Sequence, residues 1–353
     1  MPAERSSVIP GELCSPAQTR TSWPTCFLVD NLKMTTPQIT FLFPGQGSQA
    51  VGMGKELAEK YPVAGQTFDE ADEALGYKLS QLCFEGPEEK LRMTEITQPA
   101  ILTASVAAWR VLEEKGVSPS FVAGHSLGEY SAHVAAGTLS FSDAVRTVRN
   151  RGKYMQEAVP VGVGAMAAVL GMDLEKLIAV CTDAAQGEVC QPANINSPEQ
   201  IVISGHTAAV ERAAKLASER GAKRAVMLSV SAPFHCSLMM PAQNRLAADL
   251  KSVQFQKPKV PVVCNVEAAL LEDADASRDA LVRQVTGAVK WNQSMCLLIA
   301  KGMQMFVEVG PGKVLCGLTR QIDRSKTCLN VGDEASLHKT LEQLADRTAT
   351  PRG

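Results

Sequence analysis

Short apolar runs alternate along the chain with longer stretches in which apolar positions recur at helical spacing. One stretch, QPAILTASVAAWRVLEEKG (98–116), predicts a helix, with a proline near its start and a glycine at its end. Further helices are expected over 52–75, 127–140 and 141–159, and Ser142 is the expected N-cap of the last. Buried strands are predicted for QITFLF (38–43), SFVAG (120–124), VPVVCNV (260–266) and MQMFVEVG (303–310). Strands that alternate with helices in this way predict an α/β domain.

The rhythm changes between residues 162 and 230. Strands are predicted for 164–171, 189–195, 199–205 and 223–230, and helices for 173–185 and 206–221. The resulting order, β-α-β-β-α-β, is typical of a ferredoxin-like unit. The predicted fold is therefore a large α/β-hydrolase-like domain (34–161 and 231–345) with an inserted small ferredoxin-like subdomain (162–230).

The first 33 residues differ from the rest, because they are rich in Pro, Ser and Thr and show no periodicity. They lack the long apolar centre of a secretory signal, and their acidic residues offset their basic ones, which argues against an organelle transit peptide. We interpret residues 1–33 as a disordered tail or an upstream extension, with Met34 opening the folded part.

Composition narrows the class of protein. The chain has 353 residues, of which 45% are hydrophobic, and its net charge is −2. No basic block favours nucleic acid, and no apolar run approaches the length of a membrane span. The ten cysteines are scattered, without a Cys-x-x-Cys pair or metal-ligand spacing, and are expected to be reduced, mostly buried thiols. A cytoplasmic protein without a metal site is expected.

The stretch GHSLGEY (124–130) contains the pattern Gly-x-Ser-x-Gly between a predicted strand and a predicted helix. Small residues on both sides of Ser126 permit a tight turn that exposes the hydroxyl near the positive end of the helix dipole. This setting favours a nucleophilic serine. The alternative is an ordinary turn in which Ser126 only caps the helix.

A nucleophilic serine needs a base, and the sequence offers five histidines: His125, His133, His206, His235 and His338. His235 follows the last strand of the small unit, where a chain returning to the large domain can aim it at Ser126. A purely structural histidine is the alternative. No Asp or Glu stands out as a third member, so a backbone or amide carbonyl is the expected partner of the imidazole.

Two further segments are candidates for binding. The glycine-rich loop FPGQGSQAVGMG (43–54) fits neither nucleotide-binding pattern, and it is either a plain turn or a source of an oxyanion donor, the N–H of Gln46. Arg146, Arg149 and Arg151 crowd one predicted helix. Surface arginines are usually solvated, but one buried guanidinium facing a pocket would select a carboxylate.

Together these segments resemble the malonyl-CoA:acyl carrier protein transacylase family of type II fatty acid synthesis. The resemblance covers nearly all of the chain from Thr36 onward. It is carried, in order, by FPGQGSQ, GHSLGEYSA, RGKYMQEAVPVGVGAMAA, NINSP, APFH and VEVGPGKVL.

The resemblance implies a role for each matching residue. Ser126 matches the nucleophile, His235 the general base, and Gln284 the residue whose backbone carbonyl orients the histidine. Gln46 and Leu127 match the oxyanion donors, and Arg151 matches the arginine that pairs with the malonyl carboxylate. The remaining implied substrate-binding residues, besides Gln46, are His125, Asn194 and Asn196.

The implied activity is that of an [acyl-carrier-protein] S-malonyltransferase. It moves a malonyl group from malonyl-CoA to the phosphopantetheine thiol of holo acyl carrier protein through a malonyl-serine. The resemblance implies no cofactor, no nucleic acid, no membrane and a monomer. The alternatives are a serine hydrolase (esterase or thioesterase), a polyketide-pathway acyltransferase and a non-catalytic docking subunit, which would have a degraded site.

Overall fold

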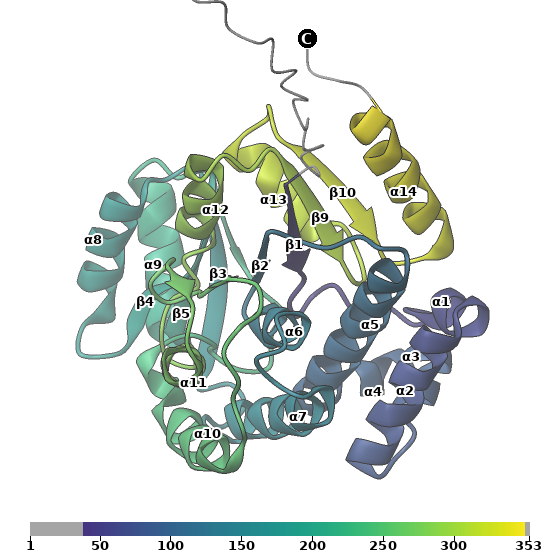
Figure 1. Ribbon diagram of the computed structural model, residues 1–353. Coiled ribbons are helices and arrows are strands. Elements are labelled where there is room, and N and C mark those ends of the chain that lie inside the picture. The colour runs from purple at the N-terminus through teal and green to yellow at the C-terminus, as the bar shows by residue number, and fades with distance from the viewer. Residues whose placement is uncertain (1–37, 350–353) are drawn as a thin grey trace, which may run out of the picture. The chain divides into compact units, whose positions relative to one another are not determined.

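The computed structural model describes residues 38–349, and a six-stranded sheet forms its centre (Figure 1). The strand order is β10-β9-β1-β2-β7-β8, and only the β7–β8 pair is antiparallel. The bounds are β1 Ile39–Phe43, β2 Phe121–Gly124, β7 Val262–Val263, β8 Leu270–Leu271, β9 Met305–Val309 and β10 Thr327–Val331. In Figure 1 the arrows of β10, β9 and β1 lie side by side.

Helices cover both faces of this sheet. Successive side chains of a strand point to opposite faces, and those of β1 are apolar on both, so each face needs a covering layer. Phe41 and Phe43 of β1 share a core with α5, α6, α7 and α14, whereas Leu42 packs with α12 and α13. The helices of the first group are α1 Lys55–Lys60, α2 Pro62–Leu75, α3 Leu79–Glu85, α4 Glu88–Leu91, α5 Thr94–Glu114, α6 Gly128–Ala135, α7 Phe141–Glu157, α10 Met240–Ser252, α11 Ala274–Arg283 and α14 Glu334–Ala349. Those of the second are α12 Trp291–Ala300 and α13 Val314–Ile322.

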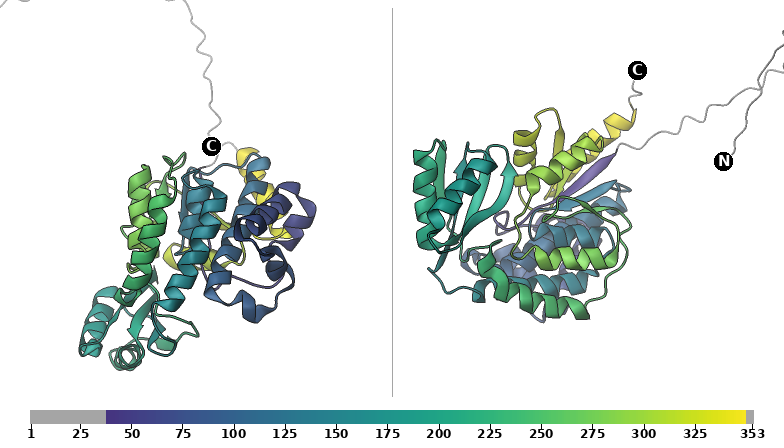
Figure 2. Two further views of the ribbon diagram at one scale, coloured as in Figure 1. Left: turned by 90° about the horizontal axis from the view of Figure 1, so that it is seen from below. Right: turned by 90° about the vertical axis from the view of Figure 1, so that its left-hand side faces the viewer.

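A second, antiparallel sheet of four strands is inserted between α7 and α10 (Figure 2). Its order is β4-β5-β3-β6, and its elements follow the chain order β-α-β-β-α-β, as expected. Side chains such as Val169 and Ile203 face the two helices, whereas Met166 and Val202 face the other way. The bounds are β3 Gly164–Leu170, α8 Leu174–Ala185, β4 Cys190–Ser197, β5 Gln200–His206, α9 Thr207–Glu219 and β6 Arg224–Met227.

Strand β4 also pairs with a segment that lies outside the small sheet, between α11 and α12. The N–H of Ile195 donates to the carbonyl of Val289 at 2.8 Å, and the N–H of Val289 donates to the carbonyl of Ala193 at 2.8 Å. This two-way backbone pairing brings the cavity-facing side of β4 up to the segment between α11 and α12.

Several element boundaries differ from the expected ones. The helix expected over 52–75 is two helices that meet at Tyr61, and α5 begins one turn earlier than expected, at Thr94. The N-cap of α7 is Ser140 and not Ser142, because the Ser140 hydroxyl accepts from the N–H of Asp143 at 3.1 Å. Ser142 instead donates to Glu70. The runs 223–230 and 260–266 form only short strands.

The expectation of reduced cysteines is wrong for one pair. Cys316 of α13 and Cys328 of β10 form a disulfide, with Cα atoms 5.2 Å apart. Packing of α13 against β10 brings the two within bonding distance, which their separation of 12 residues does not reveal. The free cysteines among residues 38–349 are Cys83, Cys181, Cys190, Cys236, Cys264 and Cys296.

The expected tail, residues 1–33, lies outside the described residues. Within those that are described, no helix has both the length and the apolar character needed to cross a membrane.

Candidate active site

Ser126 lies in a sharp turn between β2 and α6. Its φ of 51° is in the left-handed region, which costs a residue with a side chain about 1–2 kcal/mol. The flanking glycines permit the turn. A Cβ on Gly124 would meet the carbonyl carbon of Gly128 at 1.9 Å, and one on Gly128 would meet the carbonyl oxygen of Phe43 at 2.0 Å. The two glycines of the sequence pattern are therefore required by close backbone contacts.

Side-chain amides hold the backbone of this turn. The N–H of Ser126 donates to Asn265 Oδ1 at 2.7 Å, and its carbonyl accepts from Gln284 Nε2 at 2.9 Å. Asn265 Nδ2 donates in turn to the carbonyl of Gly124 at 2.7 Å. Asn265 therefore bonds to the chain on both sides of His125 and fixes the direction in which the Ser126 hydroxyl points.

The imidazole of His235 lies against that hydroxyl, with Nε2 2.7 Å from Ser126 Oγ. Its Nδ1 lies 2.9 Å from the backbone carbonyl of Gln284. A carbonyl can only accept, so Nδ1 carries the proton and Nε2 is left to accept from the serine hydroxyl. Burial, and after it the charge of Arg151, lowers the pKa of His235 to about 3. This geometry is the one that a nucleophilic serine and its base require.

The guanidinium of Arg151 lies next to the same hydroxyl. It is 1% exposed, and its Nη2 is 3.3 Å from Ser126 Oγ and 3.0 Å from Gln284 Oε1. Its Nη1 donates to Gln98 Oε1 at 2.8 Å. By contrast, Arg146 is exposed and pairs with Asp143. Of the three arginines that crowd this helix in the sequence, Arg151 is thus the one whose guanidinium is buried.

A cavity of about 690 Å³ opens in front of these groups. The small sheet forms part of its wall, through residues that include Met166 and Val202. Gln284 is fully buried and does not line it. The other predicted site residues all do: Gln46, His125, Ser126, Leu127, Arg151, Asn194, Asn196 and His235.

Two residues that line this cavity, Gln46 and Leu127, have backbone N–H groups without partners among residues 38–349. Neither the N–H of Gln46 nor that of Leu127 donates a hydrogen bond within the described part of the chain. The loop that carries Gln46 is fixed by bonds from Gly47 to Gln49 Oε1 at 2.7 Å and from Ser48 to the carbonyl of Gly45 at 2.8 Å. Unpartnered N–H groups beside a nucleophile can stabilise an oxyanion.

The remaining predicted binding residues link the two sheets. His125 Nε2 is 2.8 Å from Asn196 Oδ1, and the His125 ring packs against Trp291 with centroids 5.5 Å apart. Asn196 and Asn194 both lie on β4, with 8% of each residue exposed. His125 therefore shapes the cavity wall rather than contacting the Ser126 hydroxyl.

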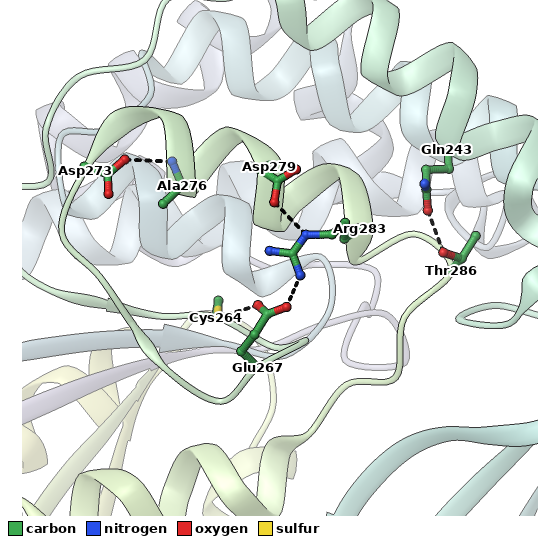
Figure 3. Close-up of polar contacts among 8 residues, drawn as sticks. All are labelled: Gln243, Cys264, Glu267, Asp273, Ala276, Asp279, Arg283 and Thr286. Atoms are coloured by element: carbon green, nitrogen blue, oxygen red, sulfur yellow. Dashed lines mark hydrogen bonds and ion pairs between the residues drawn. The ribbon is translucent and has the colours of Figure 1, made fainter.

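The segment around Gln284 is held by contacts of its neighbours, shown in Figure 3. Asp273 caps α11 by accepting from the N–H of Ala276 at 2.7 Å. Arg283 forms ion pairs with Glu267 and with Asp279. These contacts, on exposed side chains, fix the position from which Gln284 reaches His235.

Three buried residues of the site went unrecognised in the sequence: Gln98, Glu129 and Asn265. Glu129 Oε2 accepts from Gln284 Nε2 at 2.7 Å and from the N–H of Asn265 at 3.1 Å. Burial raises the pKa of Glu129 to about 7. No sequence signal marks the three, because an acidic residue is common on the first turn of a helix and burial depends on the fold.

The other histidines lie away from this chemistry. His133 is fully buried, and its ring has no hydrogen bond partner in the part of the chain that the structure describes. His206 Nδ1 accepts from the N–H of Val189, and His338 is on the exposed side of α14. Among residues 38–349, no group of three or more His, Cys, Asp or Glu is arranged to hold a metal ion.

Comparison with known proteins shows which family this chain resembles. A family described as the acyl transferase domain matches residues 40–345. The malonyl CoA-acyl carrier protein transacylase of Salmonella typhimurium is 51% identical over 87% of this chain and 99% of its own length. The enzyme of that name from Bacillus subtilis is 49% identical over 88% of this chain and 98% of its own.

Solved structures agree with these matches. The malonyl CoA-acyl carrier protein transacylase of Coxiella burnetii has a TM-score of 0.86 and 45% identity, covering 88% of this chain and 98% of that one. A malonyl-transacylase in complex with a type II polyketide acyl-carrier protein has a TM-score of 0.85 and 49% identity, covering 87% and 99%. The mixed α/β fold with two sheets is therefore shared with these proteins.

Proposed function

The chain belongs to the acyl transferase domain family, and from this membership we propose that it transfers a malonyl group from malonyl-CoA to the phosphopantetheine thiol of an acyl carrier protein. One observation carries the proposal. A buried guanidinium, Arg151, lies 3.3 Å from the hydroxyl of Ser126, which itself lies 2.7 Å from the imidazole of His235. This combination suits an acyl group that ends in a carboxylate.

In the first half of the reaction, His235 Nε2 takes the proton of Ser126, and Oγ attacks the thioester carbonyl. The N–H groups of Gln46 and Leu127 stabilise the oxyanion of the tetrahedral intermediate. The carbon–sulfur bond then breaks, and the leaving coenzyme A takes the proton from His235. In the second half, the carrier thiol gives its proton to His235 and its sulfur attacks the ester carbonyl. The bond between that carbonyl and Oγ then breaks, and His235 gives the proton to Oγ, which restores the Ser126 hydroxyl and leaves the malonyl group on the carrier thiol.

Arg151 supplies selectivity in this proposal. A malonyl carboxylate can form two parallel hydrogen bonds with its guanidinium, whereas an acetyl group leaves the buried charge without a partner. The incoming carboxylate also opposes the positive charge that helps to lower the pKa of His235. Malonyl binding would therefore make His235 a stronger base, and acetyl binding would not.

The alternative is a serine hydrolase with the same nucleophile. The two differ in the fate of the acyl-enzyme, because a hydrolase passes the malonyl group to water without any thiol acceptor. Intact-protein mass spectrometry after addition of malonyl-CoA, and again after holo carrier protein, separates them. We expect a malonyl adduct that persists until the thiol is added. An adduct that disappears in buffer alone would contradict the proposal.

Two variants test the assignments. Ser126→Ala should show no adduct, and a labelled Ser126→Ala protein would contradict the nucleophile. Arg151→Ala should lose malonyl transfer far more than acetyl transfer, and equal losses would contradict the carboxylate contact.

The finer predictions belong to the same proposal. They are an α/β-hydrolase-like domain (34–161 and 231–345), a ferredoxin-like subdomain (162–230), a monomer in the cytoplasm and catalysis without a cofactor. The element order β-α-β-β-α-β and the sheet order β4-β5-β3-β6 support the subdomain. The similar structure with a polyketide carrier protein keeps a polyketide pathway as a second candidate.

A further inference from the structure

The charge of Arg151 is buried without a direct counter-ion. Its three hydrogen bonds go to neutral oxygens, namely Gln98 Oε1, Gln284 Oε1 and Ser126 Oγ. It forms no ion pair with any carboxylate of residues 38–349. A buried guanidinium without compensation is costly, so the question is what balances it in the empty site.

The carboxylate that acts on Arg151 is Glu129, and it does so through Gln284. The Gln284 amide lies between the two, with Oε1 3.0 Å from Arg151 Nη2 and Nε2 2.7 Å from Glu129 Oε2. Glu129 is fully buried, and its Oε1 has no hydrogen bond partner among residues 38–349. The Arg151 guanidinium, the Gln284 amide and the Glu129 carboxylate therefore lie in this order in the interior, each in contact with the next.

The Gln284 amide can take only one orientation in this line. Reversal would turn its NH₂ group toward the guanidinium and its oxygen toward the carboxylate, and both contacts would be repulsive. The carbonyl of Ser126 also accepts from Nε2, at 2.9 Å, and adds to the preference. In the observed orientation the amide dipole is favourable at both ends.

We propose that Glu129 is a positioning residue that determines specificity: it holds the Gln284 amide as a spacer, so that Arg151 has a counter-charge one amide away and stays open to a carboxylate of the acyl group. The inference rests on the proposed role of Arg151. A carboxylate in direct contact with the guanidinium would occupy the N–H groups that the substrate needs. Three of the five N–H groups are bonded in the empty site, and Nε–H is among the others.

The place of Glu129 in the sequence fits this role. It lies three residues after Ser126, on the first turn of α6, and the N–H of Asn265 donates to its Oε2 at 3.1 Å. The same carboxylate thus accepts from the side-chain amide of Gln284 and from the backbone N–H of Asn265, the two residues whose side chains hold the Ser126 turn. Recognition of the acyl carboxylate and placement of the nucleophile therefore depend on one buried carboxyl group. Because its pKa is about 7, it carries its full charge above pH 7.

Exchanging the two side chains tests the proposal. The double variant Glu129→Gln/Gln284→Glu keeps the composition, the net charge and a hydrogen bond between the two positions, but it moves the carboxylate into contact with Arg151. The measurement is the rate of Ser126 acylation by malonyl-CoA and by acetyl-CoA, followed by intact mass after rapid quenching. The exposed Gln81→Glu variant of α3 is the matched control and should behave as the parent protein.

The exchange also removes the hydrogen bond from residue 284 to the carbonyl of Ser126, which should slow acylation by both substrates alike. Beyond that shared loss, we expect malonyl acylation to fall about 30-fold more than acetyl acylation, the value of a hydrogen bond to a charged group. Arg151→Ala added to the exchanged protein should then change the malonyl-to-acetyl ratio little further. A ratio within about threefold of the parent's would overturn the proposal, and so would equal losses for both substrates.

A second variant covers the case in which the exchanged protein does not fold. Glu129→Asp keeps the charge but withdraws it from Gln284, and we expect the malonyl-to-acetyl ratio to fall about fivefold, the order of one ordinary hydrogen bond. An unchanged ratio would overturn the proposal. If instead Arg151→Ala in the parent protein leaves the ratio unchanged, the proposed function fails, which is a different result.

Discussion

Ser126 and His235, which share a hydrogen bond, have the same kind of strained backbone conformation but lie in different surroundings. Ser126 has a φ of 51° and His235 a φ of 58°, both in the left-handed region. The Ser126 turn lies between a strand and a helix and is enclosed by the backbone of β1 and α6. The His235 loop follows β6 and precedes the short 3₁₀ turn Ser237–Met239, and its ring is fixed by a carbonyl of residue 284.

These two settings predict different effects of substitution. Around Ser126, backbone atoms lie against backbone atoms. A larger side chain there has no flexible side chain to push aside, so we expect it to lower the free energy of unfolding. Around His235 the position depends on a loop and a single remote carbonyl, so a substitution can leave the fold intact and misplace the base. Four expected outcomes test this contrast.

The largest effect is expected at the base itself. His235→Ala removes the proton acceptor of Ser126, and general bases contribute about 10²–10⁴-fold to rate, so we expect a loss of about 10³-fold in malonyl transfer. The unfolding midpoint should change little, because the loop has no regular structure to lose. Steady-state transfer and thermal unfolding measure the two.

The exposed His338→Ala serves as the control for this experiment and should keep full activity. A His235→Ala protein with more than a tenth of the parent rate would show that another group accepts the proton.

A pair of glycine substitutions sharpens the contrast. Gly128→Ala puts a Cβ 2.0 Å from the carbonyl oxygen of Phe43, and we expect it to lower the free energy of unfolding by about 3 kcal/mol. Gly164→Ala puts a Cβ 2.2 Å from the ring of Pro233, two residues before His235. That ring can move, so we expect a loss of about 1 kcal/mol but a fall in activity of about tenfold or more.

Urea unfolding and malonyl transfer, measured on both proteins, decide the comparison. If Gly164→Ala proved the less stable and the more active of the two, the contrast between the turn and the loop would be wrong.

A smaller effect is expected from the amide that holds the Ser126 backbone. Asn265→Ala leaves the N–H of Ser126 and the carbonyl of Gly124 without their partner, at a cost of about 1–3 kcal/mol each. We expect kcat to fall about 30-fold while KM for malonyl-CoA stays the same, because Asn265 is fully buried and does not line the cavity. Asn292→Ala is the control, because Oδ1 of Asn292 has no hydrogen bond partner within residues 38–349. A raised KM with normal kcat would argue against this role.

The smallest effect concerns pH and a second buried histidine. Burial lowers the pKa of His133, on α6 behind the Ser126 turn, to about 3. The imidazole in the unfolded chain binds a proton below pH 6.5, whereas buried His133 does not bind one until the pH approaches 3. The free energy of unfolding therefore falls as the pH drops from 6.5 toward 3. At pH 5 the loss from this residue is about 2 kcal/mol.

His133→Leu should therefore lose less stability than the parent between pH 7 and pH 5. The comparison of the two proteins isolates His133 from His235, whose pKa is lowered in the same direction, and from Glu129, whose raised pKa acts in the opposite sense. Parallel pH profiles from urea unfolding would refute the assignment.

The sequence by itself determined the Ser126 region. A strand, a turn and a helix are local structures, and the apolar period and the glycines of Gly-x-Ser-x-Gly specify them within a few residues. It also determined the order β-α-β-β-α-β of the inserted unit and, through the family resemblance, pointed to His235, Arg151 and Gln284. From the residues alone, His235 was one of five histidines and Arg151 one of three arginines.

Only the tertiary structure decided which of them meet. Residues 126, 151, 235 and 284 come from α7, two loops and the end of α11, and their distances depend on how the sheets and helices pack. The roles of Gln98, Glu129 and Asn265 were likewise invisible, since a buried amide or carboxylate is defined by what surrounds it. The Cys316–Cys328 disulfide has the same origin, because two packed elements bring the sulfurs together and no spacing in the sequence records that contact.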